Sequence, residues 1–133
     1  MSPLNRITLE VLPGAFAVCR LPPGAPLPSQ GRAPFWSLTR TPDEVSVVCA
    51  EADSPKGAVV EGGWSALKVR GPLDFALTGI LASIAQPLAD AGVAIFAVST
   101  YDTDYVLLRT ADLGTAVECL GGAGHEVATA KYV

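Results

Sequence analysis

The clearest pattern of helix and strand lies in residues 79–108, GILASIAQPLADAGVAIFAVSTYDTDYVLL. At its start, apolar residues recur every three or four positions, which predicts an amphipathic helix over 79–91. The apolar run 93–98 predicts a strand at the centre of a covered sheet. A polar turn over 99–104 then separates this strand from a further one that follows it directly.

The flanking segments extend the pattern on both sides. Upstream, residues 66–70 alternate between apolar and basic side chains, as a half-buried strand does. Downstream, Thr110 or Asp112 is predicted to cap a second helix that reaches Leu120, and residues 126–133 are predicted to form a last strand. The resulting order is β-α-β-β-α-β, which predicts an α+β, ferredoxin-like fold with an antiparallel sheet and two helices on one of its faces.

The N-terminal half is less regular and mostly β. Strands are expected at 7–11, 15–21 and 45–49 because apolar and β-branched residues dominate there. The proline-rich segment 22–34 is expected to be a loop, and residues 51–63 an acidic, glycine-containing connector.

The length of 133 residues fits one domain or two small ones. We expect a β-rich segment, residues 1–63, to pack on a main domain formed by residues 64–133. Half of the residues are apolar, which is enough for a well-packed core.

The charge pattern argues against a nucleic-acid partner. Nine basic and 13 acidic residues give a net charge of −4, and no two basic residues are adjacent. A nucleic-acid surface needs a basic stripe that neutralises phosphates. The apolar stretch 73–98 is broken by Asp74, Pro87 and Asp90, so no membrane span is expected either. No signal peptide is evident at the N-terminus.

The three cysteines are expected to be free. Cys19, Cys49 and Cys119 are odd in number and far apart, and they match neither a disulfide framework nor a zinc motif. Each lies in an apolar run, where cysteine behaves as a small core hydrophobe. This usage predicts a reducing, cytoplasmic setting.

Several segments carry a more specific signal. They are WSLTRTPDE (36–44), GW (63–64), GPLDF (71–75), LTGILASI (77–84), PLA (87–89) and STYDTDYVL (99–107). Together they resemble a bacterial ACT-domain protein family related to the ACT domains of the animal cytosolic arginine sensor. The resemblance implies side-by-side pairing of domains, a homodimer, and an amino acid bound at or near the pairing. The N-terminal half could then be a degenerate ACT-like unit.

An amino-acid ligand presents one carboxylate and one ammonium. The predicted helix N-terminus offers backbone N–H groups for the carboxylate, and the aspartates of the 99–104 turn could hold the ammonium. The candidate ligand-binding residues are Thr78, Gly79, Ile80, Ser83, Thr100, Tyr101, Asp102 and Asp104. The alternative is that Gly79 only starts the helix and that the aspartates are ordinary turn residues.

Arginine, tryptophan and histidine side chains elsewhere in the chain could serve in binding or in the structure. Arg40 could pair with a ligand carboxylate or, as a structural ion pair, with Asp43. Trp36 and Trp64 could line a pocket or pack in the core. His125, the only histidine, is expected at the surface or at a sheet edge.

No catalytic pattern is present in the sequence. It lacks a P-loop, a dinucleotide fingerprint and a nucleophile elbow, and one histidine cannot form a metal cluster with the scattered cysteines. We therefore predict a non-enzymatic regulatory protein that binds an amino acid and uses no cofactor or metal. The alternatives are a structural dimerisation module without a ligand and a minor enzymatic or chaperone-like role.

Overall fold

The structure, a computed structural model, describes residues 6–71 and 79–128. The chain divides into two compact units, which we call unit 1 (Met1–Pro13 and Ser65–Val133) and unit 2 (Gly14–Trp64). Unit 2 is therefore inserted into unit 1. The first strand of the chain belongs to unit 1, whereas the sequence placed it with residues 1–63.

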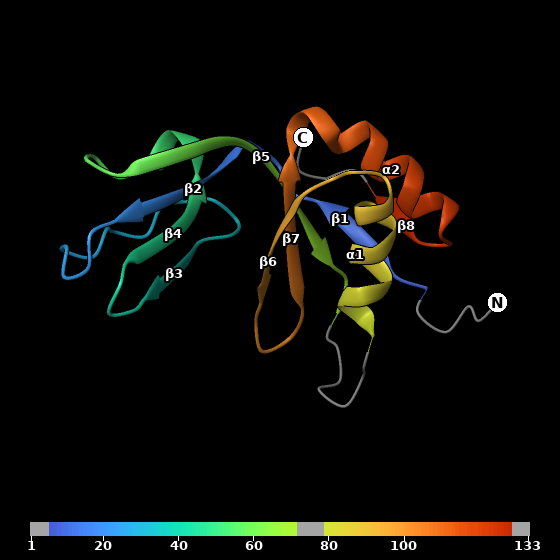
Figure 1. The fold of residues 1–133 in the computed structure, drawn as a ribbon, viewed down its shortest axis with the longest axis horizontal. Helices are drawn as coiled ribbons and strands as arrows, with labels where there is room; N and C mark the ends of the chain where they lie inside the picture. Colours follow the sequence, from blue (N-terminus) through green and yellow to red (C-terminus); the bar gives the residue numbers. More distant parts are fainter. Residues whose placement is uncertain (1–5, 72–78, 129–133) are drawn as a thin grey trace. The chain divides into compact units, whose positions relative to one another are not determined.

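Among the described residues, unit 1 is an α+β unit with five strands and two helices, and Figure 1 shows how these elements follow one another. Its elements are β1 (Thr8–Val11), the second half of β5 (Val59–Val69), α1 (Ile80–Asp90), β6 (Ile95–Ser99), β7 (Asp104–Arg109), the 3₁₀ turn η2 (Thr110–Asp112), α2 (Leu113–Gly122) and β8 (Glu126–Ala128). The strands follow the order β6-β7-β5-β1-β8. From β5 onward the chain has the predicted ferredoxin-like order β-α-β-β-α-β.

Strand β1 is an addition to that order. It lies between β5 and β8, antiparallel to β5 and parallel to β8, so that Leu9 is opposite both Val69 and Val127. The unit 1 sheet is therefore mixed, whereas the sequence predicted an antiparallel one. The pairing of β1 with β8 joins residues 118 positions apart, such as Leu9 and Val127, and no local sequence pattern predicts such a pairing.

The core of unit 1 lies between the sheet and the helices, which run side by side against one sheet face (Figure 1). The fully buried core side chains are Leu9, Leu67, Val69, Ile84, Leu88, Val106, Leu108, Ala116 and Leu120. They come from β1, β5, β7 and both helices, which agrees with the predicted amphipathic stripes. Neither helix of the described residues is long and apolar enough to cross a membrane.

Strand β6 differs from its prediction. It begins at Ile95 instead of Val93, and none of its five residues is fully buried. Among the described strands it pairs only with β7, so it is an edge strand and not a central one. An apolar run predicts a strand that is buried between two neighbouring strands. A strand at the edge of a sheet can have the same apolar composition.

Helix α1 ends at a glycine, and α2 begins differently from its prediction. Gly92, with φ of 77°, follows α1, and the Val93 N–H donates to the Leu88 carbonyl in a Schellman-type end. At α2 no side chain caps the first turn. Asp112 is the N-cap residue, as one of the two predictions had it, although its side chain makes no capping hydrogen bond, whereas Thr110 bonds the hydroxyl of Ser65 at 2.9 Å.

His125 is buried and not at the surface as the sequence suggested, with 8% of its area exposed. Its Nδ1 accepts a hydrogen bond from the Ile7 N–H (3.1 Å), and its Nε2 lies 2.9 Å from the Ser83 carbonyl oxygen. The Nε2-protonated tautomer satisfies both contacts. The ring therefore links the start of β1, the first turns of α1 and the start of β8.

Unit 2 is a four-stranded β unit. Its elements are β2 (Phe16–Leu21), β3 (Ser37–Arg40), β4 (Val45–Ala50), the 3₁₀ turn η1 (Glu51–Asp53) and the first half of β5, in the order β3-β4-β2-β5. The residues Ala17, Cys19, Leu21, Val45, Val47 and Cys49 form one core, against which Trp36 packs. Trp36 is half-buried and Trp64 is buried, so both tryptophans pack against the core, which is one of the two interpretations from the sequence.

The first half of β5 lies where the sequence predicts a connector over residues 51–63. A β-bulge interrupts the strand pattern there. Phe16 is opposite Trp64 and Val18 is opposite Glu61, so that Gly62 and Gly63 together face Ala17. Gly63 adopts a φ of 78°, and its N–H donates to the Glu51 carboxylate at 2.7 Å. A Cβ on Gly62 would approach the same carboxylate to 2.7 Å.

We expect Gly63→Ala to lower the free energy of unfolding by about 1 kcal/mol, because an L-residue is strained at this φ. The matched control is Gly114→Ala in α2, where an added Cβ meets no atom within 4 Å. That change should stabilise by up to about 1 kcal/mol through helix propensity. Urea unfolding measures both changes in the free energy of unfolding. If Gly63→Ala stabilised the protein as Gly114→Ala does, the strained bulge would be contradicted.

The cysteines of unit 2 are protected thiols. Burial, together with the neighbouring Cys19, raises the pKa of Cys49 from 9.0 to about 12. Between about pH 9 and 12 the unfolded state releases this proton while the folded state retains it, so stability should fall as the pH rises through this window. Cys49→Ala should remove part of that decline in alkaline unfolding titrations. A wild-type Cys49 that reacts with a thiol reagent at neutral pH without unfolding would contradict this account.

Candidate functional site

The candidate site in unit 1 begins with the turn between β6 and β7. The Thr100 N–H donates to the Thr103 carbonyl (2.8 Å), and the Thr100 hydroxyl both donates to that carbonyl and accepts from the Thr103 N–H. Thr103 is buried, and its hydroxyl donates to the Val69 carbonyl at 2.6 Å. The turn is therefore fixed against the carboxyl end of β5.

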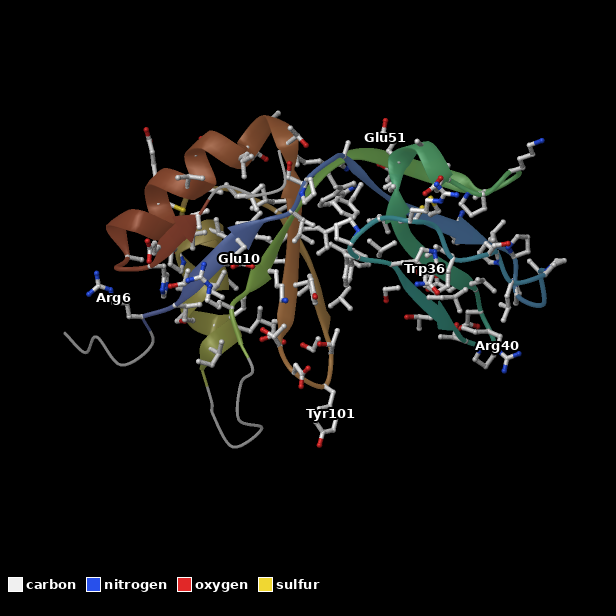
Figure 2. All side chains as sticks on the ribbon, turned by 180° about the vertical axis from the view of Figure 1, so that it is seen from behind. Arg6, Glu10, Trp36, Arg40, Glu51 and Tyr101 are labelled. Atoms are coloured by element: carbon white, nitrogen blue, oxygen red, sulfur yellow. The ribbon has the colours of Figure 1, made fainter. Side chains whose placement is uncertain are left out.

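The acidic and aromatic side chains of this turn differ in their surroundings. Asp104 is half-buried and accepts a hydrogen bond from the Ser99 hydroxyl at 2.6 Å, which leaves its second carboxylate oxygen available. Asp102 is exposed, and no partner of its carboxylate is found among the described residues. Tyr101 is 80% exposed and projects from the tip of the turn (Figure 2). The turn thus presents two carboxylates beside an exposed aromatic ring.

The second part of the candidate site is the start of α1. Gly79 precedes the helix with φ of 77°, and no side chain of the described residues caps the first turn. The first N–H groups of α1 therefore have no side-chain acceptor within the part of the chain that the structure describes. Thr78, a further candidate, lies outside the described residues.

The topology brings these two parts to the same end of unit 1. The turn after β6 is bonded to Val69, at the end of β5, and the chain passes from that end of β5 toward the start of α1. Figure 1 shows the first turn of α1 and the β6–β7 turn at one end of the unit. The sequence alone did not bring these two turns together within one subunit.

Ser83 is engaged within the protein. Its hydroxyl donates to the Ile80 carbonyl at 2.7 Å, and its own carbonyl faces His125. Its side chain lies one turn inside the helix and is half-buried. The Ser83 carbonyl therefore holds α1 to the start of β8, and its hydroxyl could contact a ligand only as an acceptor.

The structure changes the interpretation of Arg40 and assigns a role to Thr103. Arg40 is exposed and makes no ion pair with Asp43 or any other described residue, where a structural pair was expected. Thr103 was not among the candidates although it lies in the STYDTDY segment, and its buried bond to Val69 makes it the anchor of the turn. Within residues 6–71 and 79–128, no group of three or more possible metal ligands is close enough to bind an ion.

Comparison with known proteins gives the class. A family model described as an ACT domain matches residues 59–121, and a model of an N-terminal domain matches residues 14–57. The chain contains an ACT domain over residues 59–121, which confirms the resemblance and the α+β fold predicted from the sequence.

Several named proteins are similar to this chain in sequence or in structure. The chain is 33% identical over 105 residues to "Cytosolic arginine sensor for mTORC1 subunit 1" of Bos taurus, covering 71% of this chain and 32% of that protein. It thus spans about a third of the sensor's length. The crystal structure of protein Atu0741 from Agrobacterium tumefaciens is 38% identical, covers 96% of both chains and has a TM-score of 0.88. The ligand-free regulatory subunit of aspartate kinase from Thermus thermophilus, at 11% identity and a TM-score of 0.59, shares the fold over 84% of this chain and 93% of that one.

Proposed function

We propose that this chain is a non-enzymatic regulatory module that binds a free amino acid at an interface between domains or subunits. One observation carries the proposal, namely that the uncapped start of α1 and the carboxylates of the β6–β7 turn occupy the same end of unit 1. The helix N-terminus suits the ligand carboxylate, and Asp102 and Asp104 suit its ammonium.

The relatives support this ligand class. The bovine relative is named as an arginine sensor, and the aspartate kinase relative is named as a regulatory subunit. The sensor's name also supports a cytosolic location for this chain. Arginine itself does not follow from the likeness, because the chain matches 32% of the sensor.

Pairing through β6 would complete the site with residues of a second copy. Strand β6 has a backbone partner on one side only among the described strands, and its sequence Ile95–Ser99 is mostly apolar. Such an edge can add a strand from another chain. A homodimer of this kind would place the α1 and β6–β7 end of one subunit near the corresponding strand of its partner.

We expect one amino acid, screened with the other nineteen at millimolar concentration, to raise the midpoint of thermal unfolding. A ligand that binds only the folded state stabilises by about 2.7 kcal/mol at a hundred times its dissociation constant. Asp104→Asn should strongly reduce the shift, because the amide has no charge to attract the ammonium, while its carbonyl oxygen can still accept from the Ser99 hydroxyl. Differential scanning fluorimetry measures the shift, and light scattering gives the mass in solution.

Glu118→Gln is the control, because this exposed residue lies on α2, far along the chain from the turn. It removes one carboxylate and should leave the shift unchanged. If no amino acid changes the unfolding midpoint of the wild-type protein, the sensor function is refuted. A dimer without a ligand shift would instead favour a structural dimerisation module, which the apolar edge strand β6 also fits.

A further inference from the structure

Helix α1 contains a proline, which leaves one of its carbonyl groups without a donor from the helix. In an α-helix each backbone N–H donates to the carbonyl four residues earlier, so residue 87 would donate to Ser83. Pro87 has no N–H group. The Ser83 carbonyl oxygen is therefore open to a donor from outside the helix.

His125 supplies that donor. Its Nε2 lies 2.9 Å from the Ser83 carbonyl oxygen, and its Nδ1 accepts the Ile7 N–H at 3.1 Å. Its backbone N–H donates to the Leu120 carbonyl, in the last turn of α2, at 3.0 Å. One buried residue thus connects α1 with α2 and with the segment that leads into β1.

Ser83 in turn is bonded to both residues at which α1 begins. Its N–H donates to the Gly79 carbonyl at 2.9 Å, and its hydroxyl donates to the Ile80 carbonyl at 2.7 Å. A shift of the Ser83 backbone would therefore move Gly79 and Ile80 with it. These two residues belong to the part of the candidate site that offers backbone N–H groups to a ligand.

We propose that His125 is a positioning residue of the amino-acid site on unit 1. By holding the Ser83 carbonyl, the ring keeps the first turn of α1 in the orientation in which its N–H groups meet the ligand carboxylate. Pro87 gives the ring this role, since a residue with an N–H group would hold the same carbonyl within the helix. The inference rests on the proposed function and extends it to a residue that acts through Ser83 without touching the ligand.

The test compares two amide variants, each of which keeps one of the two contacts of the ring. In His125→Asn the amide oxygen can take the place of Nδ1 and accept from Ile7, whereas in His125→Gln the longer side chain brings an amide N–H to the Ser83 carbonyl. We expect His125→Asn to weaken ligand binding about tenfold and His125→Gln to stay within about twofold of the wild type. Isothermal titration calorimetry on the full chain, with L-arginine first and then the other nineteen amino acids, gives the dissociation constants.

A purely structural role of the ring would not produce this difference. Each variant loses one hydrogen bond, so urea unfolding should show a loss of stability in both, while only His125→Asn loses affinity. Hydrogen exchange without any ligand gives a second readout. The Ser83 amide should exchange faster in His125→Asn than in His125→Gln, and equal rates in the two variants would overturn the positioning role.

Pro87→Ala tests the route through the Ser83 carbonyl. Alanine restores an N–H group that can donate to this carbonyl within the helix. In this background His125→Asn should weaken binding by less than about threefold, because the two donors replace one another. A tenfold loss in both backgrounds would overturn the proposed route.

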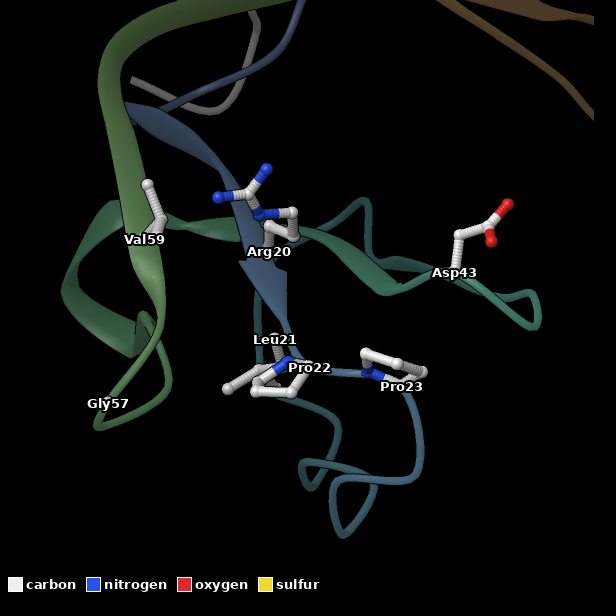
Figure 3. Close-up of a pocket in the computed structure, with 7 residues that line it drawn as sticks. All are labelled: Arg20, Leu21, Pro22, Pro23, Asp43, Gly57 and Val59. Atoms are coloured by element: carbon white, nitrogen blue, oxygen red, sulfur yellow. The ribbon is translucent and has the colours of Figure 1, made fainter.

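A pocket on unit 2 is the competing place for a small ligand. It has a volume of about 310 Å³, and Arg20 and Asp43 are among its lining residues (Figure 3). The Arg20 guanidinium and the Asp43 carboxylate are directed apart in Figure 3, so the neighbouring carboxylate and ammonium of one amino acid cannot bind both. Arg20→Gln therefore serves as the control, and it should leave the dissociation constant unchanged.

The outcomes separate this inference from the proposed function. If an amino acid binds, Asp104→Asn weakens it and the two His125 variants bind equally, the function stands and the positioning role is overturned. If Arg20→Gln weakens binding and neither His125 variant does, the ligand lies in the pocket of unit 2, and both proposals fail. If no amino acid binds the wild-type protein, the function is refuted and the positioning role with it.

Discussion

Replacing Leu67 by alanine is expected to lower the free energy of unfolding by about 2–5 kcal/mol. Leu67 is 0% exposed and lies on β5, which pairs with β1 on one side and β7 on the other in the unit 1 sheet. The substitution removes its contacts with the core and leaves a cavity that the paired strands cannot close. Urea unfolding followed by circular dichroism measures the loss.

Leu27→Ala is the matched control for this experiment. Leu27 is 55% exposed and lies in the proline-rich loop of unit 2, so the same chemical change removes little buried surface. Its effect should stay within about 0.5 kcal/mol of zero. Similar losses for Leu27→Ala and Leu67→Ala would mean that the described core of unit 1 is not the main source of its stability.

Replacing His125 by alanine is expected to cost about 2–4 kcal/mol. The change leaves the Ile7 N–H and the Ser83 carbonyl without their partners in a buried setting, and each orphaned group costs about 1–3 kcal/mol. Exchange of the Ile7 amide hydrogen should also become faster, because its acceptor is lost. Urea unfolding gives the stability, and hydrogen exchange followed by NMR gives the local effect.

Asparagine at position 125 provides the comparison. Its carbonyl oxygen can take the place of Nδ1 and accept from the Ile7 N–H, while the contact with Ser83 is lost. His125→Asn should therefore cost less than His125→Ala and should preserve slow exchange at Ile7. A loss below about 0.5 kcal/mol in the alanine variant would refute the bridging role of the ring.

The sequence predicted the helices and their neighbouring strands well, because these elements carry a local periodic signal. The apolar stripe of α1 and the glycine at its end are both present in the structure. The run from Val93 to Val98 was placed at the centre of the sheet because it is apolar, but β6 lies at an edge. Amino-acid composition indicates that a strand lacks charged residues. It does not indicate whether the strand pairs with one neighbouring strand or with two.

Other features depend on contacts between distant parts of the chain and so left no local signal. The position of β1 between β5 and β8 is one example, and the burial of His125 is another, since its partner Ile7 lies 118 positions away. The bulge at Gly62 and Gly63 interrupts the alternation from which a strand is predicted. At the candidate site the polar residues could be identified, whereas the bond of Thr103 to Val69 that positions the turn could not.

The insertion of unit 2 into unit 1 has a consequence for synthesis on the ribosome. Strand β1 is made before either of its neighbours, and β8 is made about a hundred residues later, at roughly 5–20 residues per second. The nascent chain can therefore complete unit 2 while β1 has no partner and its apolar residues are exposed to chaperones or to other chains. Unit 1 can close only after β8 has left the exit tunnel.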